Sequence, residues 1–351
     1  MIYTKDEINL IAVDSFDDLT YREKRLFLAA RKKGGESAKY EDELIKSCGA
    51  GVYNKLREKF CDESYLSKIV STLDKIGVRC ITIKSEGYPE GLNHVKNPPL
   101  VLYARGNTEL LKRRIFCVVG SRKSTTQAIE ECKNISGRLA EYFVVATGIA
   151  DGADSAAALG ALDSGNVICV LPCGHKYSST LSRRVEAKGL SLSEFPPDTR
   201  IQSYTFTLRN RILAGLSDGV LVVSAAIHGG ALSTAAYAAD YGKDVFAFPY
   251  SIGVSTGEGC NNLIKSGAYL CDSAEDILSV MGVDCVSATQ EVELDDDERA
   301  VISVLKDEGE MHAEKLAAAT GKKLYELAAI CSSLEIKGII VRVAGNRYAV
   351  L

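Results

Sequence analysis

An arginine beside a glycine-rich turn is the first feature of this sequence that could do chemistry. The apolar run Ile115–Val119 leads into Gly120, Ser121 and Arg122, and a helical pattern begins near Thr125. A turn from a strand into a helix aims backbone N–H groups and the helix dipole at an anion. Arg122 can add two parallel hydrogen bonds to one phosphate. The alternative is an ordinary turn with a solvated arginine, and the tripeptide alone does not decide between them.

A second segment brings basic and aromatic side chains together. Arg209 and Arg211 flank the amide of Asn210, and Phe206 lies three residues before the first arginine. Rings and guanidinium groups suit flexible single strands, because every base has a π-face on which they can stack. The competing interpretation places Phe206 in the core and leaves the arginines solvated or ion-paired. The residue types alone favour this second interpretation.

Three further segments could support a ligand near these two. The turn Gly148–Asp154 is glycine-rich but acidic, so we expect Asp154 to cap a helix or orient a basic neighbour rather than touch a phosphate. The loop His228–Thr234 is a second candidate phosphate-binding turn, in which the histidine is more often a loop residue than a catalyst. Lys265 could neutralise a phosphate, although a lone surface lysine usually does nothing specific.

A parallel sheet is the element that would bring these segments together. Between residues 81 and 283, short β-branched runs alternate with helical patterns, which indicates a parallel sheet covered by helices on both faces. The carboxyl ends of such strands meet at one edge, where ligands of open α/β folds bind. The expected strands are Ile115–Val119, Phe143–Ala146, Val167–Leu171, Leu190–Ser193, Val220–Ser224 and Val245–Phe248.

The rest of the chain divides into smaller parts. Residues 1–80 show helical periodicity, and residues 284–296 are acidic and aperiodic, as expected of a linker. Residues 297–351 contain three helical patterns and a hairpin about Gly345, which fits a winged-helix domain. Its third helix carries two lysines at its start but two glutamates along it, a poor basic face for a DNA groove. We therefore expect a structural or protein-interaction role for this domain.

Composition excludes several classes of protein. The 351 residues are 46% hydrophobic with a net charge of −4, and no apolar run reaches the ~18 residues of a membrane span, so we expect a cytoplasmic protein without a membrane partner. Eleven cysteines without a CxxC pattern are expected to be reduced thiols. Four histidines without ligand spacing predict no metal site. The first core strand is not followed by GxGxxG, so no dinucleotide cofactor is expected.

In their order, these segments resemble the DNA-processing protein A family (DprA, also called Smf). The resemblance covers about residues 81–283, and the flanking helical and winged-helix parts agree with it. It implies a helical SAM-like module at 1–80, an extended Rossmann DNA-binding domain at 81–283 and a winged-helix domain at 297–351. The matching motifs are Gly87-Tyr88-Pro89 with Leu92, Pro98–Tyr103 with Gly106, Gly120-Ser121-Arg122, Gly148–Asp154, Ser193–Pro197, Phe206 with Arg209-Asn210-Arg211, Gly215-Leu216, and Asn262–Ile264 with Gly267-Ala268.

The resemblance also implies a function. Proteins of this family bind and protect single-stranded DNA and load the RecA recombinase onto it during DNA uptake, natural transformation and recombination. They form homodimers, and no catalytic activity is attributed to them. By similarity, the residues expected to contact DNA are Gly120, Ser121, Arg122, Phe206, Arg209, Asn210, Arg211 and, less directly, Lys265.

The sequence departs from the family pattern at four places. Ala156-Ala157 replace a frequent histidine, Ser224 replaces a glutamate, Gly229-Gly230-Ala231 replace Ser-Gly-Ser, and Tyr177-Ser178 replace Tyr-Pro. These changes bear on how tightly the loop at 224–234 holds a ligand.

Two other functions remain open from the sequence. A nucleotide-handling enzyme of the lysine-decarboxylase-like phosphoribohydrolase type needs a carboxylate as acid or base, typically a glutamate after its glycine loop. Here no glutamate follows Gly229-Gly230 before Asp240, which disfavours an enzyme. A transcription regulator that reads duplex DNA with its wing is disfavoured by the poor basic face of the third helix.

Overall fold

The computed structural model describes residues 3–16, 19–31, 37–283 and 294–350. It divides into two compact units, Met1–Asp284 and Cys285–Leu351. Most of the acidic linker predicted at 284–296 lies outside the described residues, because these resume only at residue 294.

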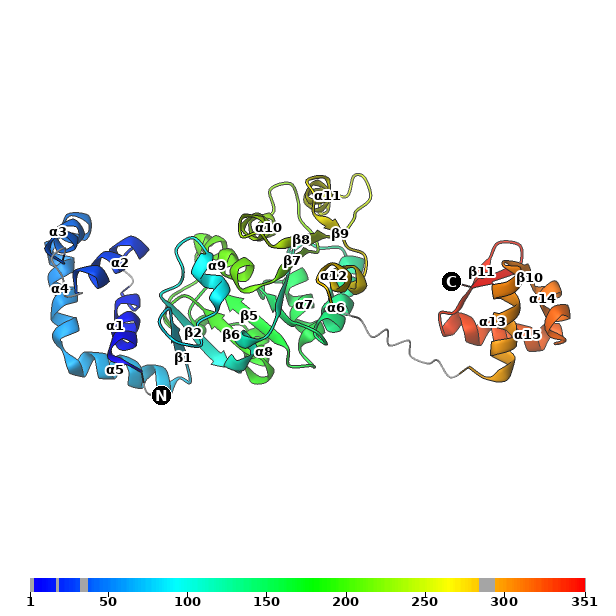
Figure 1. Ribbon diagram of the computed structural model, residues 1–351, viewed down its shortest axis with the longest axis horizontal. Coiled ribbons are helices and arrows are strands. Elements are labelled where there is room, and N and C mark those ends of the chain that lie inside the picture. Colours follow the sequence, from blue (N-terminus) through cyan, green and yellow to red (C-terminus); the bar gives the residue numbers. More distant parts are fainter. Residues whose placement is uncertain (1–2, 17–18, 32–36, 284–293, 351) are drawn as a thin grey trace. The chain divides into compact units, whose positions relative to one another are not determined.

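The first unit begins with helices (Figure 1). Thr4 and Thr20 each form a capping box with the glutamate three residues later, which satisfies backbone donors at the start of α1 and α2. Phe27, Leu44 and Phe60 are buried in the core that these helices share. The helices are α1 (Lys5–Asp14), α2 (Tyr21–Ala30), α3 (Ser37–Cys48), α4 (Ala50–Cys61) and α5 (Glu63–Lys75).

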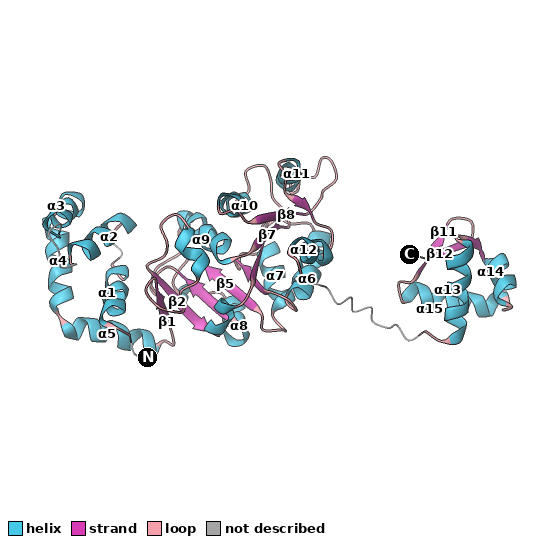
Figure 2. Cartoon of the chain, in the orientation of Figure 1, coloured by secondary structure: helices cyan, strands magenta, loops and turns pink. Residues whose placement is uncertain are grey.

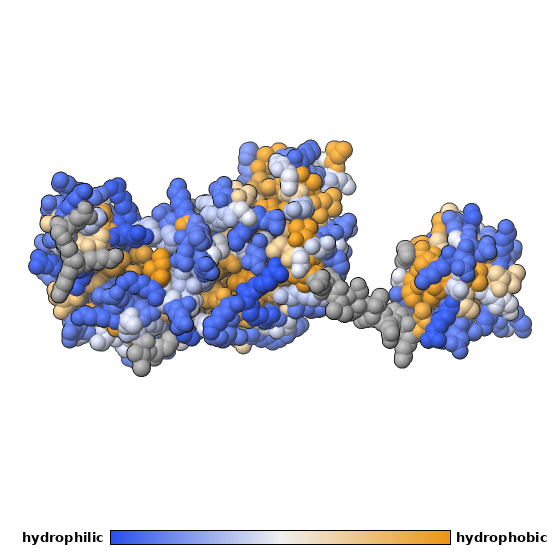
Figure 3. All heavy atoms as spheres, in the orientation of Figure 1, coloured by the Kyte–Doolittle hydropathy of each residue, from blue (hydrophilic) through white to orange (hydrophobic). Residues whose placement is uncertain are grey.

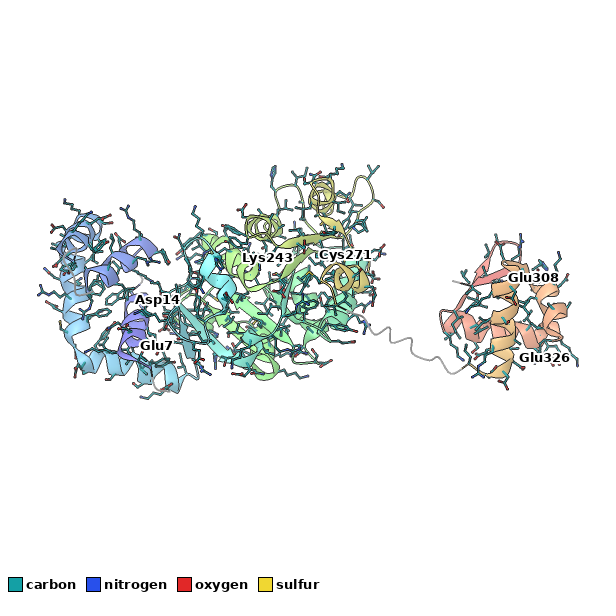
Figure 4. All side chains as sticks on the ribbon, viewed as in Figure 1. Glu7, Asp14, Lys243, Cys271, Glu308 and Glu326 are labelled. Atoms are coloured by element: carbon teal, nitrogen blue, oxygen red, sulfur yellow. The ribbon has the colours of Figure 1, made fainter. Side chains whose placement is uncertain are left out.

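Polar contacts join these helices to the sheet. The buried hydroxyl of Tyr103 donates to Oδ2 of Asp14 at 3.0 Å, and Ser85 donates to Oε1 of Glu7 at 2.6 Å. Figure 4 labels Glu7 and Asp14 on the side of α1 that faces β1 and β2. The helices therefore belong to the same compact unit as the sheet. The predicted SAM-like module with a boundary at residue 80 stays a prediction.

The described residues of this unit contain one nine-stranded sheet, in the order β1-β2-β6-β5-β4-β3-β7-β8-β9. The seven strands from β6 to β9 in this order are parallel, whereas β2, near one edge, runs antiparallel to both of its neighbours, β6 and β1. The strands are β1 (Arg79–Thr82), β2 (Val101–Gly106), β3 (Ile115–Val119), β4 (Val144–Thr147), β5 (Val167–Leu171), β6 (Leu190–Ser193), β7 (Gly219–Val222), β8 (Asp244–Ala247) and β9 (Tyr269–Leu270). The predicted mostly parallel α/β core is confirmed.

Helices cover both faces of this sheet (Figure 2). Alternate residues of β3 take part in two cores: Cys117 and Val119 join the apolar cluster of α9 and α10, whereas Phe116 packs against the rings of Phe143 and Phe246. The helices are η1 (Glu90–His94), η2 (Thr108–Lys112), α6 (Thr126–Leu139), α7 (Ala153–Ala161), η3 (His175–Tyr177), α8 (Thr180–Lys188), α9 (Ser203–Leu216), α10 (Ala231–Asp240), α11 (Glu258–Lys265) and α12 (Ala274–Val280), where η marks a 3-10 helix.

The second unit is a winged helix, as predicted. Its hydrophobic core includes Leu316, Leu327 and Leu334, and buried Glu298 binds Nζ of Lys337 at 2.6 Å. Figure 3 shows apolar residues gathered on part of its visible surface. Its elements are α13 (Asp296–Glu308), β10 (Met311–His312), α14 (Ala313–Thr320), α15 (Leu324–Ile336), β11 (Ile340–Val343) and β12 (Arg347–Val350), with the sheet order β10-β12-β11.

The described residues contain neither a candidate membrane span nor a candidate metal cluster. No described helix is long and apolar enough to cross a membrane. No cluster of three or more His, Cys, Asp or Glu side chains in the described part of the chain could hold a metal ion.

Candidate nucleic-acid interface

A cavity of about 420 Å3 lies where β3 and β7 end, beside α9 and α10. It is at the carboxyl edge of the parallel strands, the place where ligands of such folds bind. Six of the eight residues predicted from the sequence line it: Gly120, Ser121, Arg122, Phe206, Arg209 and Asn210. The structure thus brings together two segments that are more than 80 residues apart.

The turn after β3 is held tightly by its neighbours. A Cβ at position 120 would lie only 2.6 Å from Cβ of Ala153, so the turn has no room for a side chain there. The N–H of Gly120 donates to Oδ1 of Asp154 at 3.1 Å, and the N–H of Ser121 donates to Oγ of Ser224 at 3.0 Å. These two N–H groups therefore already have partners within the protein. An anion at this turn would therefore meet the groups that follow, including the side chain of Arg122.

Arg122 and Phe206 form a cation–π pair. The guanidinium carbon of Arg122 lies 4.9 Å from the centroid of the Phe206 ring. Arg122 is exposed and Phe206 is half-buried, so neither is a core residue. The pair places a flat apolar ring and a permanent positive charge side by side in the lining of the cavity.

Arg209 is fixed by the surrounding structure. Its side chain is buried, with the residue 4% exposed. Nη1 donates to the carbonyl oxygen of Val170 at 2.7 Å, and Nε donates to Oδ1 of Asn210 at 3.0 Å. Gly148 packs directly against the guanidinium, where a Cβ would collide with both Nη atoms. This explains the glycine in the turn after β4.

Asp154 accepts hydrogen bonds from both glycine-rich turns, the one after β3 and the one after β4. Its Oδ1 accepts from Gly120, and its Oδ2 accepts from the N–H of Ala150 at 3.4 Å. Burial raises the pKa of Asp154, and the positive charge of Arg209 opposes this rise. The same burial lowers the pKa of the Arg209 guanidinium. Asp154 therefore organises the turn and faces a basic neighbour, in line with the role expected from the sequence.

Arg211 and Lys265 are not among the residues that line the cavity. The guanidinium of Arg211 is buried and forms a bidentate ion pair with Glu194. In this pair Nη2 lies 2.6 Å from Oε2, and Nη1 lies 3.0 Å from Oε1. Nη2 also donates to the carbonyl oxygen of Asn97 at 3.0 Å. Arg209 and Arg211 diverge because residues two apart on a helix differ by about 200° in direction. The contacts with DNA predicted for Arg211 and Lys265 stay predictions.

The structure adds two residues that sequence reasoning did not assign. Lys123 lines the cavity next to Arg122, and its position directly after the motif could have indicated this. Ser224, noted as a departure from the family pattern, accepts the N–H of Ser121 and hydrogen-bonds to Ser124. No local pattern could have shown that contact, because about 100 residues separate the partners.

The cavity carries positive charge within an acidic chain. Its lining residues include Arg122, Lys123 and Arg209 but only one carboxylate, Asp154. The net charge of the whole chain is −4. A local excess of this kind attracts phosphate groups without making the protein basic overall.

Comparison with known proteins identifies relatives. Residues 79–282 match the profile of the family described as DNA recombination-mediator protein A, and residues 286–346 match the DprA winged helix domain. The chain is 34% identical over 224 residues to the DNA processing protein DprA of Streptococcus pneumoniae, covering 62% of this chain and 78% of that protein.

Solved structures agree in fold. A crystal structure of DprA from Streptococcus pneumoniae superposes with a TM-score of 0.64 at 29% identity, covering 80% of this chain and 98% of that one. DprA from Helicobacter pylori, studied for its single-stranded DNA binding mode, superposes with a TM-score of 0.53 at 26% identity, covering 58% of this chain and 95% of that one.

Proposed function

The chain belongs to the DNA recombination-mediator protein A (DprA/Smf) family, and from that premise we propose that it binds single-stranded DNA at the cavity beside Arg122 and Phe206. The observation that carries this proposal is the contact of these two side chains, 4.9 Å from guanidinium carbon to ring centroid. A ring can stack on a base, and the adjacent cations can neutralise the phosphates on either side of it. The single-stranded DNA binding of the Helicobacter pylori relative supports the same choice of ligand.

Single strands fit this site better than a duplex does. A base must leave its stack before its face can reach a side chain such as Phe206, and this costs less in an unpaired strand, where no base pair has to be broken. The ring is half-buried in the wall of a cavity rather than on a protruding helix that could enter a groove. Because stacking tolerates any base, we expect little sequence preference.

Further parts of the function rest on the family alone. We propose that the bound strand is protected and handed to the RecA recombinase, that the protein acts as a cytoplasmic homodimer, and that it serves DNA uptake, natural transformation and recombination. A DNA strand-exchange assay with RecA tests the loading step. In it, the single-stranded DNA is first coated with a single-strand-binding protein. Faster exchange in the presence of this protein supports it, and an unchanged rate contradicts it.

The nucleotide-hydrolase alternative is weakened by the state of Asp154. It is the sole carboxylate among the residues that line the cavity, and it already accepts two N–H groups beside the Arg209 charge. A general acid or base needs a carboxyl that can exchange a proton with the substrate. We therefore propose a binding role without catalysis. Release of base or phosphate from nucleoside monophosphates during incubation with the protein would overturn this.

The experiment that tests the proposal is an anisotropy titration of labelled single-stranded and duplex oligonucleotides at low and physiological salt. We expect a preference for the single strand and weaker binding at higher salt, because phosphate counterions are released on binding. Arg122→Ala should weaken binding, whereas Arg57→Ala, which removes an equal charge from an exposed position of α4, should not. Equal binding of both variants would reject the site, and absence of binding at low salt would reject the function.

A further inference from the structure

A second arginine–aromatic pair lies at the same edge of the sheet. Nε of Arg200 donates to the hydroxyl of Tyr177 at 3.3 Å, and its guanidinium carbon lies 5.9 Å from the ring centroid. Tyr177 ends η3, which follows β5, and Arg200 lies in the loop between β6 and α9. Arg200 is exposed and Tyr177 is half-buried. This is the same combination of ring and cation as Arg122 with Phe206.

The charge of Arg200 is left without a counterion. Within the described part of the chain, no carboxylate lies within 4.0 Å of its guanidinium. Of its five N–H donors, the one on Nε is bonded to Tyr177. By contrast, the pair formed by Arg138 on α6 and Tyr142 in the turn after it is neutralised, since Arg138 pairs with both Glu141 and Glu275. Arg200 therefore has the donors and the charge to bind a phosphate, and Arg138 does not.

The two pairs lie close enough for one strand to reach both. Only β4 separates β3 from β5, so the strand ends that carry the two sites are two interstrand spacings apart, roughly 10 Å. Arg200 precedes Phe206 by six residues, so the chain between them spans at most about 20 Å. A few nucleotides of an extended single strand cover such a distance.

The loop that carries Arg200 is fixed against η3. The N–H of Gly174 donates to the carbonyl oxygen of Thr199 at 2.9 Å, and the N–H of Lys176 donates to that of Pro197 at 3.1 Å. Gly174 has no room for a Cβ, because the carbonyl groups of Pro196 and Pro197 pack against it. The loop backbone next to Arg200 is therefore held against the segment that ends in Tyr177, a favourable property for a binding site.

From these observations we propose that Tyr177 and Arg200 form a second nucleotide subsite of the single-stranded DNA path. Tyr177 stacks on a base and Arg200 binds an adjacent phosphate, a few nucleotides from the base held at Phe206. This inference rests on the proposed function, because it extends the same strand along the same sheet edge. With two subsites, a strand long enough to reach both Phe206 and Tyr177 should bind more tightly than a strand that reaches only the cavity at Phe206.

The test compares strand lengths in variants of the full chain. Anisotropy competition is measured with oligothymidylates of three and of about twelve nucleotides against the parent protein and a Tyr177→Ala, Arg200→Ala double variant. We expect the double variant to lose about ten-fold in affinity for the longer strand, the loss of one stacked base and one phosphate contact, and to bind the trinucleotide like the parent. Tyr177→Phe, which keeps the ring, should retain most of the affinity.

Matched variants separate this inference from the function itself. Arg138→Ala with Tyr142→Ala removes a pair of the same composition from the end of α6 and the turn after it, and should leave both affinities unchanged. Parent-like binding of the longer strand by the Tyr177→Ala, Arg200→Ala variant, while Phe206→Ala weakens it, overturns the second subsite and leaves the proposed function intact. Failure of the parent to bind any strand overturns the function instead. Arg200→Ala alone, a change at an exposed side chain, repeats the test if the double variant melts at a lower temperature than the parent.

Discussion

The guanidinium of Arg122 and the ring of Phe206, which come from segments 84 residues apart, lie in cation–π contact at 4.9 Å. The contact joins the turn after β3 to the first half of α9, in the lining of the cavity that the two segments share. A base that stacks on the ring therefore finds a cation in place beside it. This arrangement reduces the ordering cost of binding, because both side chains are partly held before the strand arrives.

Removal of the Phe206 ring should weaken binding without harming the fold. Phe206→Ala loses stacking worth about 1–3 kcal/mol per base, which calorimetric titration with a single-stranded oligonucleotide measures. Thr207→Ala, at the exposed next residue of α9, is the matched control and should bind like the parent. Parent-like affinity of Phe206→Ala would contradict the stacking role.

The contribution of Arg122 should be visible in the salt dependence. If Arg122 neutralises one phosphate, Arg122→Ala should reduce the slope of log K against log salt by about 1. Arg122→Lys should keep the slope, because it keeps the charge, but should lose affinity because an ammonium lacks the planar fork. Titrations at four salt concentrations measure the slope. An unaltered slope in Arg122→Ala would show that this side chain does not contact phosphate.

Arg209 should matter for folding as well as for binding. Arg209→Ala leaves the Val170 carbonyl without this donor and removes the positive charge beside buried Asp154. We expect a loss of about 3 kcal/mol in the free energy of unfolding, measured by urea denaturation. Leu208→Ala, at a partly exposed neighbour on α9, should cost much less. A fully stable Arg209→Ala protein would contradict the anchoring role.

Arg211 should support the fold through Glu194. Arg211→Met leaves the Glu194 carboxyl buried without its partner, and we expect a loss of about 3–5 kcal/mol in stability. The double variant Arg211→Met, Glu194→Met removes both charges and should recover much of this loss. Thermal melting compares the three proteins. A double variant no more stable than the single one would show that the ion pair is not what Arg211 contributes.

The stability of the first unit should fall in mild acid because of His175. Burial lowers the pKa of His175 to about 4, below the ~6.5 of an unfolded histidine. Between these values the unfolded chain binds a proton that the folded chain does not, so stability is lost as the pH falls from about 6.5 to 4, by at most about 3 kcal/mol.

Melting temperatures measured between pH 4 and pH 7 test this. His175→Gln should flatten the pH dependence, whereas His94→Gln, at an exposed histidine, should not. Equal pH dependence in the parent and in His175→Gln would show that another group is responsible.

The sequence by itself determined much of the architecture. The run Ile115–Val119 coincides with β3, and Val167–Leu171 coincides with β5, because continuous β-branched segments bounded by turns have few other structures open to them. The Gly120 turn and the winged helix were also predictable, since both depend on local residue order. The antiparallel strands β1 and β2 and the short β10, which pairs with β12, were not predicted as strands, because they gain their hydrogen bonds from distant partners.

The tertiary structure alone decided which side chains form the site. Arg209 and Arg211 are alike in type and neighbourhood, yet one lines the cavity and the other pairs with Glu194. Helical geometry sends them in different directions, but which direction meets a cavity depends on segments far along the chain. The same holds for Ser224, whose bond to Ser121 spans 103 residues. Burial and pairing are properties of packing, and packing is long-range, so local sequence could not assign them.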